Sequence, residues 1–317
     1  MRLFLIGKDG SRAEVPPQLS HLREQPFEEL WAYCRHLAHN PLQFAINVLN
    51  DCDEFVRRTF FPSRNGSWLP IHIALARSSL KGEPAIAEAH LGKGKRILID
   101  CAPRDSPDPY VNIHEAFARI HESIASNQYN VSKGNIKSKV VIDAGANTGV
   151  FAIHAALMGA RRVYAFEPVS SSYELLKRNI RLNKVEHIIV PVRAGLWNKD
   201  GSTIIEFRFA GDSCANLSSK SALHPGYHTK SERITLTTVD SFLKGKSCDF
   251  IKIDAEGCES EILRGASRTI KKCKPILSFS AYHFSQDQQR LPSLVKSIRE
   301  DYDIKLNTFE EPVFYCS

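Results

Sequence analysis

Residues 139–168 read KVVIDAGANTGVFAIHAALMGARRVYAFEP, and this stretch decides the expected fold. Its first apolar run, Val140 to Ile142, predicts a strand that is buried on both faces of a parallel sheet. A glycine-containing turn follows Asp143, and apolar residues from Val150 to Leu157 then recur at three- and four-residue spacing, which predicts a helix. A second apolar strand ends at Glu167. The stretch therefore predicts a strand, turn, helix and strand in succession.

The residues of this unit favour a crevice that binds a nucleoside. Gly145 and Gly149 would let a ligand approach the backbone and let the helix pack closely on the sheet. Glu167, at the end of the second strand, is suited to hydrogen bonding with both hydroxyls of a ribose. The GxGxxG dinucleotide fingerprint would need a glycine where this chain has Asn147, and no P-loop Lys-Ser/Thr follows. A cofactor with a ribose but no phosphate, such as S-adenosylmethionine, is favoured over a tight turn in some other doubly wound protein.

Composition is typical of a globular protein with one large or two modest domains. The chain has 317 residues, of which 43% are apolar and 24% charged. The net charge of +7 is spread over short basic runs, which favours solvated faces over a nucleic-acid footprint. Eight cysteines without a CxxC pair argue against zinc and favour free thiols. With no signal-peptide core and no apolar run near the ~20 residues of a membrane span, a cytoplasmic protein is expected.

The N-terminal part of the chain is expected to be a largely helical extension. Apolar patterning predicts helices over residues 27–34 and 44–56, an alanine-rich helix near 84–90, and a strand at 96–99. Three prolines in residues 102–109 indicate a linker, and a further helix is expected over 113–126. We therefore expect an extension at residues 1–125, serving as a lid, a substrate platform or a homodimer contact, and a second domain at residues 126–317.

Strands and helices alternate through the second domain. After Glu167, Ser171 and Glu174 match a capping box at the start of a helix. Further strands are expected at residues 187–192, 203–209, 233–239, 249–254 and 275–282, with two more near 304 and 312–316. This order predicts an α/β, doubly wound, mostly parallel sheet of Rossmann-like type. Ligand sites in such sheets lie at the carboxyl ends of the strands, where Asp143, Glu167, Asp254 and His283 are expected.

Four segments resemble the FkbM-type methyltransferases in order and spacing: VIDAGANTGVFAIHAA, VYAFEPVSSSYELLKRNIRLN, DFIKIDAEGCESEILRGA and SAYH with a closing EPVFYC. The resemblance covers about residues 128–317 and implies a class I methyltransferase fold that uses S-adenosylmethionine and yields S-adenosylhomocysteine. It implies that the cofactor-binding residues are Asp143, Gly145, Ala146, Asn147, Gly149, Glu167, Pro168, Ala194, Gly195 and Asp254. It implies that the catalytic residues are His283, Asp254 and Glu256.

Methyl transfer to a hydroxyl requires alignment of the reacting atoms and removal of a proton. His283 is the preferred base, because its ordinary pKa near about 6.5 allows it to accept a proton at neutral pH; a purely structural hydrogen bond is the alternative. Asp254 and Glu256 could act as base, orient the acceptor or chelate Mg²⁺. Mg²⁺ is not favoured, and no metal ligands are assigned.

The sequence therefore predicts an S-adenosylmethionine-dependent O-methyltransferase that acts on a sugar, glycan, glycolipid or secondary-metabolite hydroxyl. The expected partner is a small-molecule or glycan acceptor rather than nucleic acid, and the residues do not identify that acceptor. N-methylation of a peptide or RNA is one alternative. A non-catalytic module that binds a nucleoside is another, and turnover with an acceptor would distinguish it from an enzyme.

Overall fold

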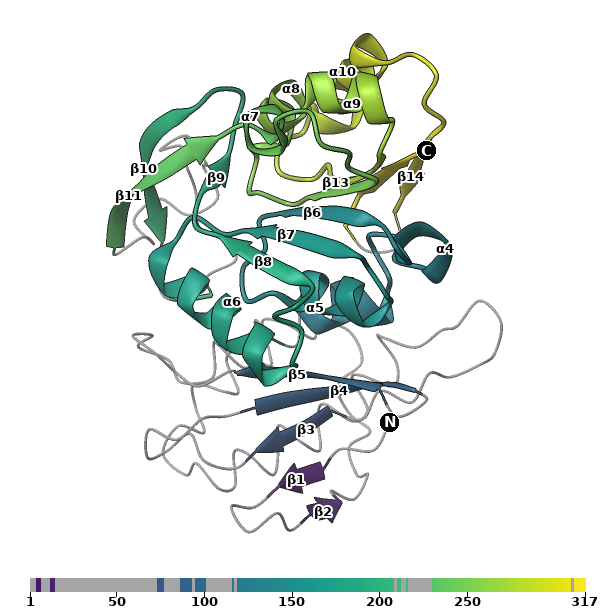
Figure 1. Cartoon of the computed structure of the whole chain (residues 1–317). Coiled ribbons are helices and arrows are strands. Elements are labelled where there is room, and N and C mark those ends of the chain that lie inside the picture. Colours follow the sequence, from purple (N-terminus) through teal and green to yellow (C-terminus); the bar gives the residue numbers. More distant parts are fainter. Residues whose placement is uncertain are drawn as a thin grey trace. The chain divides into compact units, whose positions relative to one another are not determined.

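The computed structural model describes residues 4–6, 12–14, 73–76, 86–92, 95–100, 116, 119–207, 210–211, 215, 230–308 and 311–317. The chain forms two compact units, residues 1–102 and 103–317 (Figure 1). The sequence places the domain boundary between residues 125 and 126, and that functional division stays a prediction.

The described residues of the first unit form a five-stranded sheet with the order β2-β1-β3-β4-β5. Its strands are β1 (Phe4–Ile6), β2 (Arg12–Glu14), β3 (Ile73–Ala76), β4 (Ile86–Gly92) and β5 (Lys95–Asp100). The strand expected at 96–99 is confirmed. The helix expected near 84–90 is wrong, because antiparallel pairing of β4 with β5 outweighs the helix propensity of a short alanine-rich run. The helices expected over 27–34 and 44–56 lie outside the described residues.

The second unit contains a seven-stranded sheet with the order β14-β15-β13-β12-β6-β7-β8. The pairs from β13 through β12, β6 and β7 to β8 are parallel, whereas β15 is antiparallel to both of its neighbours. The strands are β6 (Val140–Ala144), β7 (Arg162–Phe166), β8 (Ile189–Val192), β12 (Phe250–Ile253), β13 (Ile276–Ser280), β14 (Ile304–Asn307) and β15 (Val313–Cys316). The expected mostly parallel, Rossmann-like sheet is confirmed.

Helices cover both faces of this sheet, as expected of a doubly wound fold. Figure 1 shows α5 (Val150–Leu157) and α6 (Ser170–Leu182) on one face, and α8 (Glu259–Gly265), α9 (Ser267–Cys273) and α10 (Asp287–Ile298) on the other. The second group shares one apolar core with α7 (Val239–Leu243), β12 and β13. Among the described residues, no helix combines the length and apolarity needed to cross a membrane.

A smaller sheet with the order β10-β11-β9 follows β8. It is made of β9 (Gly195–Leu196), β10 (Gly201–Phe207) and β11 (Lys230–Thr237). Ile205 and Phe207 are buried whereas Ile204 is 51% exposed, the alternation typical of a half-buried strand.

The start of α6 differs from the expected capping box. Val169 is the N-cap residue, and Ser171 lies inside the first turn of the helix. The carboxylate of Glu232, on β11, takes the place of the cap: it accepts hydrogen bonds from the backbone nitrogen of Ser170 at 2.8 Å and from its hydroxyl at 2.5 Å. A residue distant in sequence therefore satisfies this helix terminus.

Candidate active site

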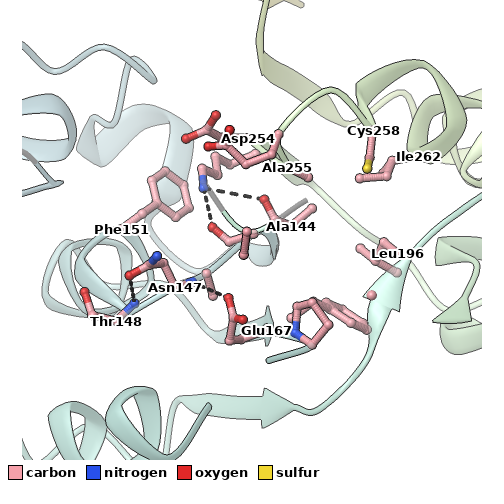
Figure 2. Close-up of a pocket in the computed structure, with 18 of the residues that line it drawn as sticks. Ala144, Asn147, Thr148, Phe151, Glu167, Leu196, Asp254, Ala255, Cys258 and Ile262 are labelled. Carbon is pink, nitrogen blue, oxygen red and sulfur yellow. Dashed lines mark hydrogen bonds between the residues drawn. The ribbon is translucent and has the colours of Figure 1, made fainter. Parts of the chain in front are cut away.

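A pocket lies at the carboxyl edge of the seven-stranded sheet (Figure 2). The turn after β6, the end of β7, the β8–β9 connection and the turn after β12 all contribute to it. Nine of the residues expected at the site line this pocket: Gly145, Ala146, Asn147, Glu167, Pro168, Ala194, Gly195, Asp254 and Glu256. Asp143, Gly149 and His283 are absent from its lining.

Glu167 lies in the pocket at the end of β7, and its carboxylate connects two turns. Its Oε2 accepts a hydrogen bond from the backbone nitrogen of Asn147 at 2.9 Å, and its Oε1 accepts one from the backbone nitrogen of Val169 at 2.9 Å. Burial raises the pKa of Glu167 to about 7, although these two hydrogen bonds act in the opposite direction. Each carboxylate oxygen has a further lone pair available to a hydroxyl donor.

The turn after β6 presents polar atoms to the same pocket. Asn147 has a φ of 49°, and its side-chain nitrogen donates to the carbonyl of Gly211 at 3.1 Å. Thr148 lines the pocket, and its buried hydroxyl has no hydrogen-bond partner among the residues that the structure describes. A buried hydroxyl without a partner is costly, so this atom is suited to a bound ligand.

Gly145 and Gly149 both have positive φ, 76° and 93°, but only Gly145 borders the pocket. A Cβ atom on Gly145 would lie 1.9 Å from the carbonyl oxygen of Asp254, so the turn can approach β12 only as glycine. A Cβ atom on Gly149 would lie 2.6 Å from a methyl group of Leu176 on α6. Gly149 therefore allows α5 and α6 to pack closely.

Asp143 is fully buried below the pocket instead of lining it. Its Oδ1 lies 3.2 Å from Nζ of Lys252, whose ammonium also donates to the carbonyl of Gly145 at 2.8 Å. Burial raises the pKa of Asp143, and the charge of Lys252 opposes that shift. The sequence interpretation overlooked Lys252, although a lysine inside a buried strand requires an anionic partner.

One wall of the pocket is apolar. Ala194 and Gly195 lie on this side, together with a hydrophobic set that the sequence interpretation did not include: Phe166, Leu196, Ile205, Ile234, Cys258 and Ile262. Ile205 and Ile234 come from the β10–β11 hairpin. Burial raises the pKa of the Cys258 thiol, which makes it an unreactive apolar surface rather than a nucleophile.

Asp254 is the centre of a hydrogen-bond network at the other end of the pocket. Its Oδ2 accepts from the hydroxyl of Tyr129 at 2.8 Å, and its Oδ1 accepts from the hydroxyls of Ser280 at 2.8 Å and Tyr282 at 3.2 Å. Burial alone would raise its pKa, but Lys252, His283 and other donors nearby outweigh burial and hold the pKa of Asp254 well below its usual range. Asp254 is thus a fixed anion and a poor proton acceptor.

His283 lies beside this network with its side chain 5% exposed. Its Nδ1 is 3.2 Å from Oε1 of Glu259, and its Nε2 is 3.5 Å from Oε2 of Glu256 and 4.0 Å from Oδ1 of Asp254. Burial alone would lower the pKa of His283, but the contacts with these carboxylates raise it to about 11. The three carboxylates favour the imidazolium form of His283 over the neutral form that a base needs, so the role of His283 as the base stays a prediction.

Asp254, Glu259 and His283 each place one possible metal-ligand atom within 4.8 Å of the others. The pair considered for Mg²⁺ from the sequence was instead Asp254 with Glu256. Oδ1 of Asp254 already accepts two hydroxyl hydrogen bonds, and Oε1 of Glu259 accepts one from the backbone nitrogen of Ala255 at 3.0 Å. These contacts describe an ion-pair network, and we assign no metal to it.

Two further charged residues reach the pocket from the segment before β6. Arg119 and Glu122 belong to the helical stretch that the sequence predicts over 113–126; its last described turn is the π-helix η2 (His121–Ala125). Nη1 of Arg119 lies 2.8 Å from Oε2 of Glu122 and 3.7 Å from Oδ2 of Asp254. Burial raises the pKa of Glu122 to about 8, partly opposed by the charge of Arg119.

His154, on α5, holds this segment in place. Its Nδ1 lies 2.9 Å from the backbone carbonyl of Ser123, and burial lowers its pKa to about 4. The lowered pKa favours the neutral form of His154, and its ring has a hydrogen-bond partner inside the core. It connects α5 to η2.

Residues 143–307, more than half of the chain, match the family described as Methyltransferase FkbM domain. The chain belongs to the FkbM methyltransferase family. The sequence resemblance is thereby confirmed, and with it the class I methyltransferase fold and S-adenosylmethionine as the cofactor. Most residues that line the pocket of this FkbM methyltransferase fall within the matched stretch, whereas Arg119 and Glu122 precede it.

Similar proteins include one methyltransferase that is named for a tRNA guanine and one whose name gives no acceptor. The chain is 28% identical over 124 residues to "tRNA (guanine(37)-N(1))-methyltransferase Trm5b" of Methanocaldococcus jannaschii, with 39% of this chain and 36% of that protein covered. It is 28% identical over 153 residues to "Methyltransferase sdnD" of Sordaria araneosa, with 39% of this chain and 59% of that protein covered. The chain thus spans between about a third and three fifths of these relatives' lengths.

A solved structure of an FkbM methyltransferase from Methylobacillus flagellatus KT is also similar. It is 23% identical, the match covers 67% of this chain and 56% of that one, and the TM-score is 0.44.

Proposed function

We propose that this FkbM methyltransferase transfers a methyl group from S-adenosylmethionine to a hydroxyl group of a neutral, polyhydroxylated acceptor such as a sugar. The supporting observation is the charge balance at the polar end of the pocket. The lining cations Arg119 and Lys252 lie 2.8 Å and 3.2 Å from carboxylate oxygens of Glu122 and Asp143. Asp254 and Glu256 add further carboxylates at this end, so an acidic acceptor would find no excess of positive charge there, whereas hydroxyl groups can hydrogen-bond with these carboxylates.

The described residues fit the cofactor. Glu167 would accept hydrogen bonds from the ribose hydroxyls, and the apolar side formed by Leu196, Ile234 and Ile262 would pack against the purine. Thr148, whose buried hydroxyl has no partner among the described residues, would hydrogen-bond to the cofactor. Bound S-adenosylmethionine supplies an electrophilic methyl group on a positively charged sulfur.

The polar end would hold and orient the acceptor. Asp254 would fix the hydroxyls of Tyr129 and Tyr282 and would favour positive charge nearby. Glu256 lines the pocket and would accept a hydrogen bond from the acceptor. His283, behind Glu256, would act as a positioning residue that keeps this carboxylate in place.

N-methylation of RNA or a peptide amine is the second candidate, because a relative is named as a tRNA methyltransferase. The pairing of Arg119 and Lys252 with carboxylates leaves these two lining cations poorly suited to phosphates, which argues against RNA. A nucleoside-binding module without turnover is the third candidate. Only turnover distinguishes it from an enzyme.

The test is an acceptor screen with S-adenosylmethionine whose methyl group carries deuterium. Purified full-length protein would be incubated with sugars, glycosides, alcohols, amines, peptides and RNA, and the products would be identified by mass spectrometry. We expect a labelled methyl ether together with an equal amount of S-adenosylhomocysteine. Label only on nitrogen, or cofactor binding without any product, would overturn the proposal.

A further inference from the structure

Glu122 lines the acceptor end of the pocket but precedes residue 143, where the family match begins. Its side chain is 12% exposed and pairs with Arg119, which also lies 3.7 Å from Oδ2 of Asp254. Glu122 therefore belongs to a segment of this chain that the family match does not include. Such a residue can determine which acceptors are methylated.

We propose that Glu122 is the catalytic base that takes the proton from the acceptor hydroxyl. This inference rests on the proposed function. It follows first from elimination among the groups around Asp254. Asp254 uses both carboxylate oxygens to accept hydrogen bonds, and His283 lies outside the pocket lining with both ring nitrogens facing carboxylates.

Glu256 is the other lining carboxylate at this end of the pocket, and its partner is His283. Oε2 of Glu256 faces Nε2 of His283 at 3.5 Å, so proton gain there would remove one of the three carboxylates that face this ring. Arg119, the partner of Glu122, also faces Asp254 and so keeps an anionic partner when Glu122 becomes neutral. Proton transfer to Glu122 therefore leaves Arg119 with a counter-charge.

The backbone around Glu122 is fixed from several sides. The carbonyl of Glu122 accepts hydrogen bonds from the backbone nitrogen of Gln128 at 2.9 Å and from the hydroxyl of Ser126 at 3.1 Å. His154 holds the next carbonyl, that of Ser123, at 2.9 Å. A π-helical turn of this kind is frequent at functional sites, and here two local hydrogen bonds and one tertiary contact, with His154, hold it.

The proposed step moves one proton and one methyl group. The Glu122 carboxylate takes the hydroxyl proton and becomes a neutral carboxylic acid. The acceptor oxygen forms a bond to the methyl carbon while the bond from that carbon to sulfur breaks and its electron pair stays on sulfur. The products are a methyl ether and neutral S-adenosylhomocysteine, and solvent later removes the proton from Glu122.

The surroundings of Glu122 set the pH at which it can act. Burial has the largest effect and raises its pKa to about 8; Arg119 and Lys252 lower the pKa, whereas Asp254 and Glu311 raise it. A base must be deprotonated to accept a proton, so turnover should rise with pH as the Glu122 carboxyl ionises near pH 8. A pKa within about a unit of neutral pH is favourable for a general base.

The experiment compares wild-type full-length protein with E122Q, E122D and the control E174Q, since Glu174 is an exposed residue of α6 away from the pocket. With a hydroxyl acceptor from the screen, we expect E122Q to lower kcat by about 10²–10⁴-fold and to lose the rise of kcat/KM near pH 8, because kcat/KM reports ionisation in the free enzyme. E122D should retain part of the turnover, and calorimetric affinity for S-adenosylhomocysteine should change by less than about threefold in all three variants. Full turnover or an unchanged pH profile in E122Q would overturn the assignment.

A second readout does not depend on turnover. Infrared difference spectra between wild type and E122Q, recorded against pH, report protonation of this carboxyl directly. We expect a midpoint near 8, and a midpoint near the ordinary value of about 4.3 would contradict the proposal. Absence of turnover in wild-type protein with every hydroxyl acceptor would instead count against the proposed function, so the two failures are distinguishable.

Discussion

Nζ of Lys252 lies 3.2 Å from Oδ1 of Asp143, and the two residues are direct partners in the pairing of β12 with β6. Both side chains are buried, and the ammonium also donates to the carbonyl of Gly145 in the turn that lines the pocket. The Lys252 ammonium lies 5.3 Å from the ring centroid of Tyr129, which is hydrogen-bonded to Asp254. This ion pair connects the centre of the sheet to both ends of the site.

Replacement of Lys252 with methionine should destabilise the protein by roughly 3–5 kcal/mol, the usual cost of leaving one partner of a buried ion pair alone. The loss of stability should grow as pH rises above about 3.9. Asp143 then ionises in the unfolded chain but stays protonated in the folded protein, where burial raises its pKa, so ionisation favours unfolding. Urea unfolding of K252M at acidic and neutral pH measures both effects.

The double variant K252M/D143N is the matched control. Asparagine removes the uncompensated charge, so the double variant should regain much of the lost free energy of unfolding. If the double variant were as unstable as the sum of the single variants, the ion pair would contribute no coupling and this interpretation would be wrong.

Gly145 and Gly201 form a second matched pair of sites. A Cβ atom on Gly145, where φ is 76°, would meet backbone atoms of Asp254, whereas nothing lies within 4 Å of one on Gly201. G145A should therefore displace the turn and weaken S-adenosylhomocysteine binding by at least about tenfold, and G201A should bind like wild type. Calorimetry on both variants tests this, and equal affinities would contradict the described turn.

His283 should remain protonated across the neutral range. Its pKa in the folded protein is about 11, above the ordinary value of 6.5. Protonated His283 therefore stabilises the folded protein fully below pH 6.5, and this stabilisation is lost as pH rises through about 11. The ¹⁵N chemical shifts of the ring should stay those of an imidazolium between about pH 6 and 9. A titration midpoint near the ordinary value would restore His283 as a candidate base.

Glu167 should make cofactor affinity depend on pH. Burial raises its pKa to about 7, and the ionised carboxylate is the better acceptor for ribose hydroxyls, so affinity should increase as pH rises through that value. Calorimetric titrations with S-adenosylhomocysteine on both sides of pH 7 check this. E167Q should show a much smaller dependence on pH, and an unchanged dependence in E167Q would assign the effect to another group.

The central strands were predictable because they are local and strongly apolar. The run Val140 to Ile142 and the segment that includes Lys252 read as buried strands, and their order alone predicted a parallel sheet with its site at one edge. The capping box at Ser171 failed for the opposite reason: the helix terminus is satisfied by Glu232, a residue of a distant strand. Only tertiary structure brings that carboxylate to the helix.

The protonation states of the site residues could not be predicted from the sequence either. The pattern placed His283 near Asp254 and Glu256, but its pKa depends on how many carboxylates surround the ring, including Glu259 on α8. Glu122 had no motif to mark it, since nothing in its segment predicts which helix face meets the pocket. Lys252 could have been found from its charge within a buried strand.

Calorimetric titration of wild-type protein, E167Q and the exposed control E174Q with S-adenosylhomocysteine, with NAD as a second ligand, tests the central claim most directly. Loss of a charge-assisted hydrogen bond of about 1.5–3 kcal/mol predicts roughly 10- to 150-fold weaker binding in E167Q, while wild type and E174Q bind with equal affinity and NAD does not bind. Binding of NAD, or equal affinity in all three proteins, would contradict the assignment of this pocket to S-adenosylmethionine.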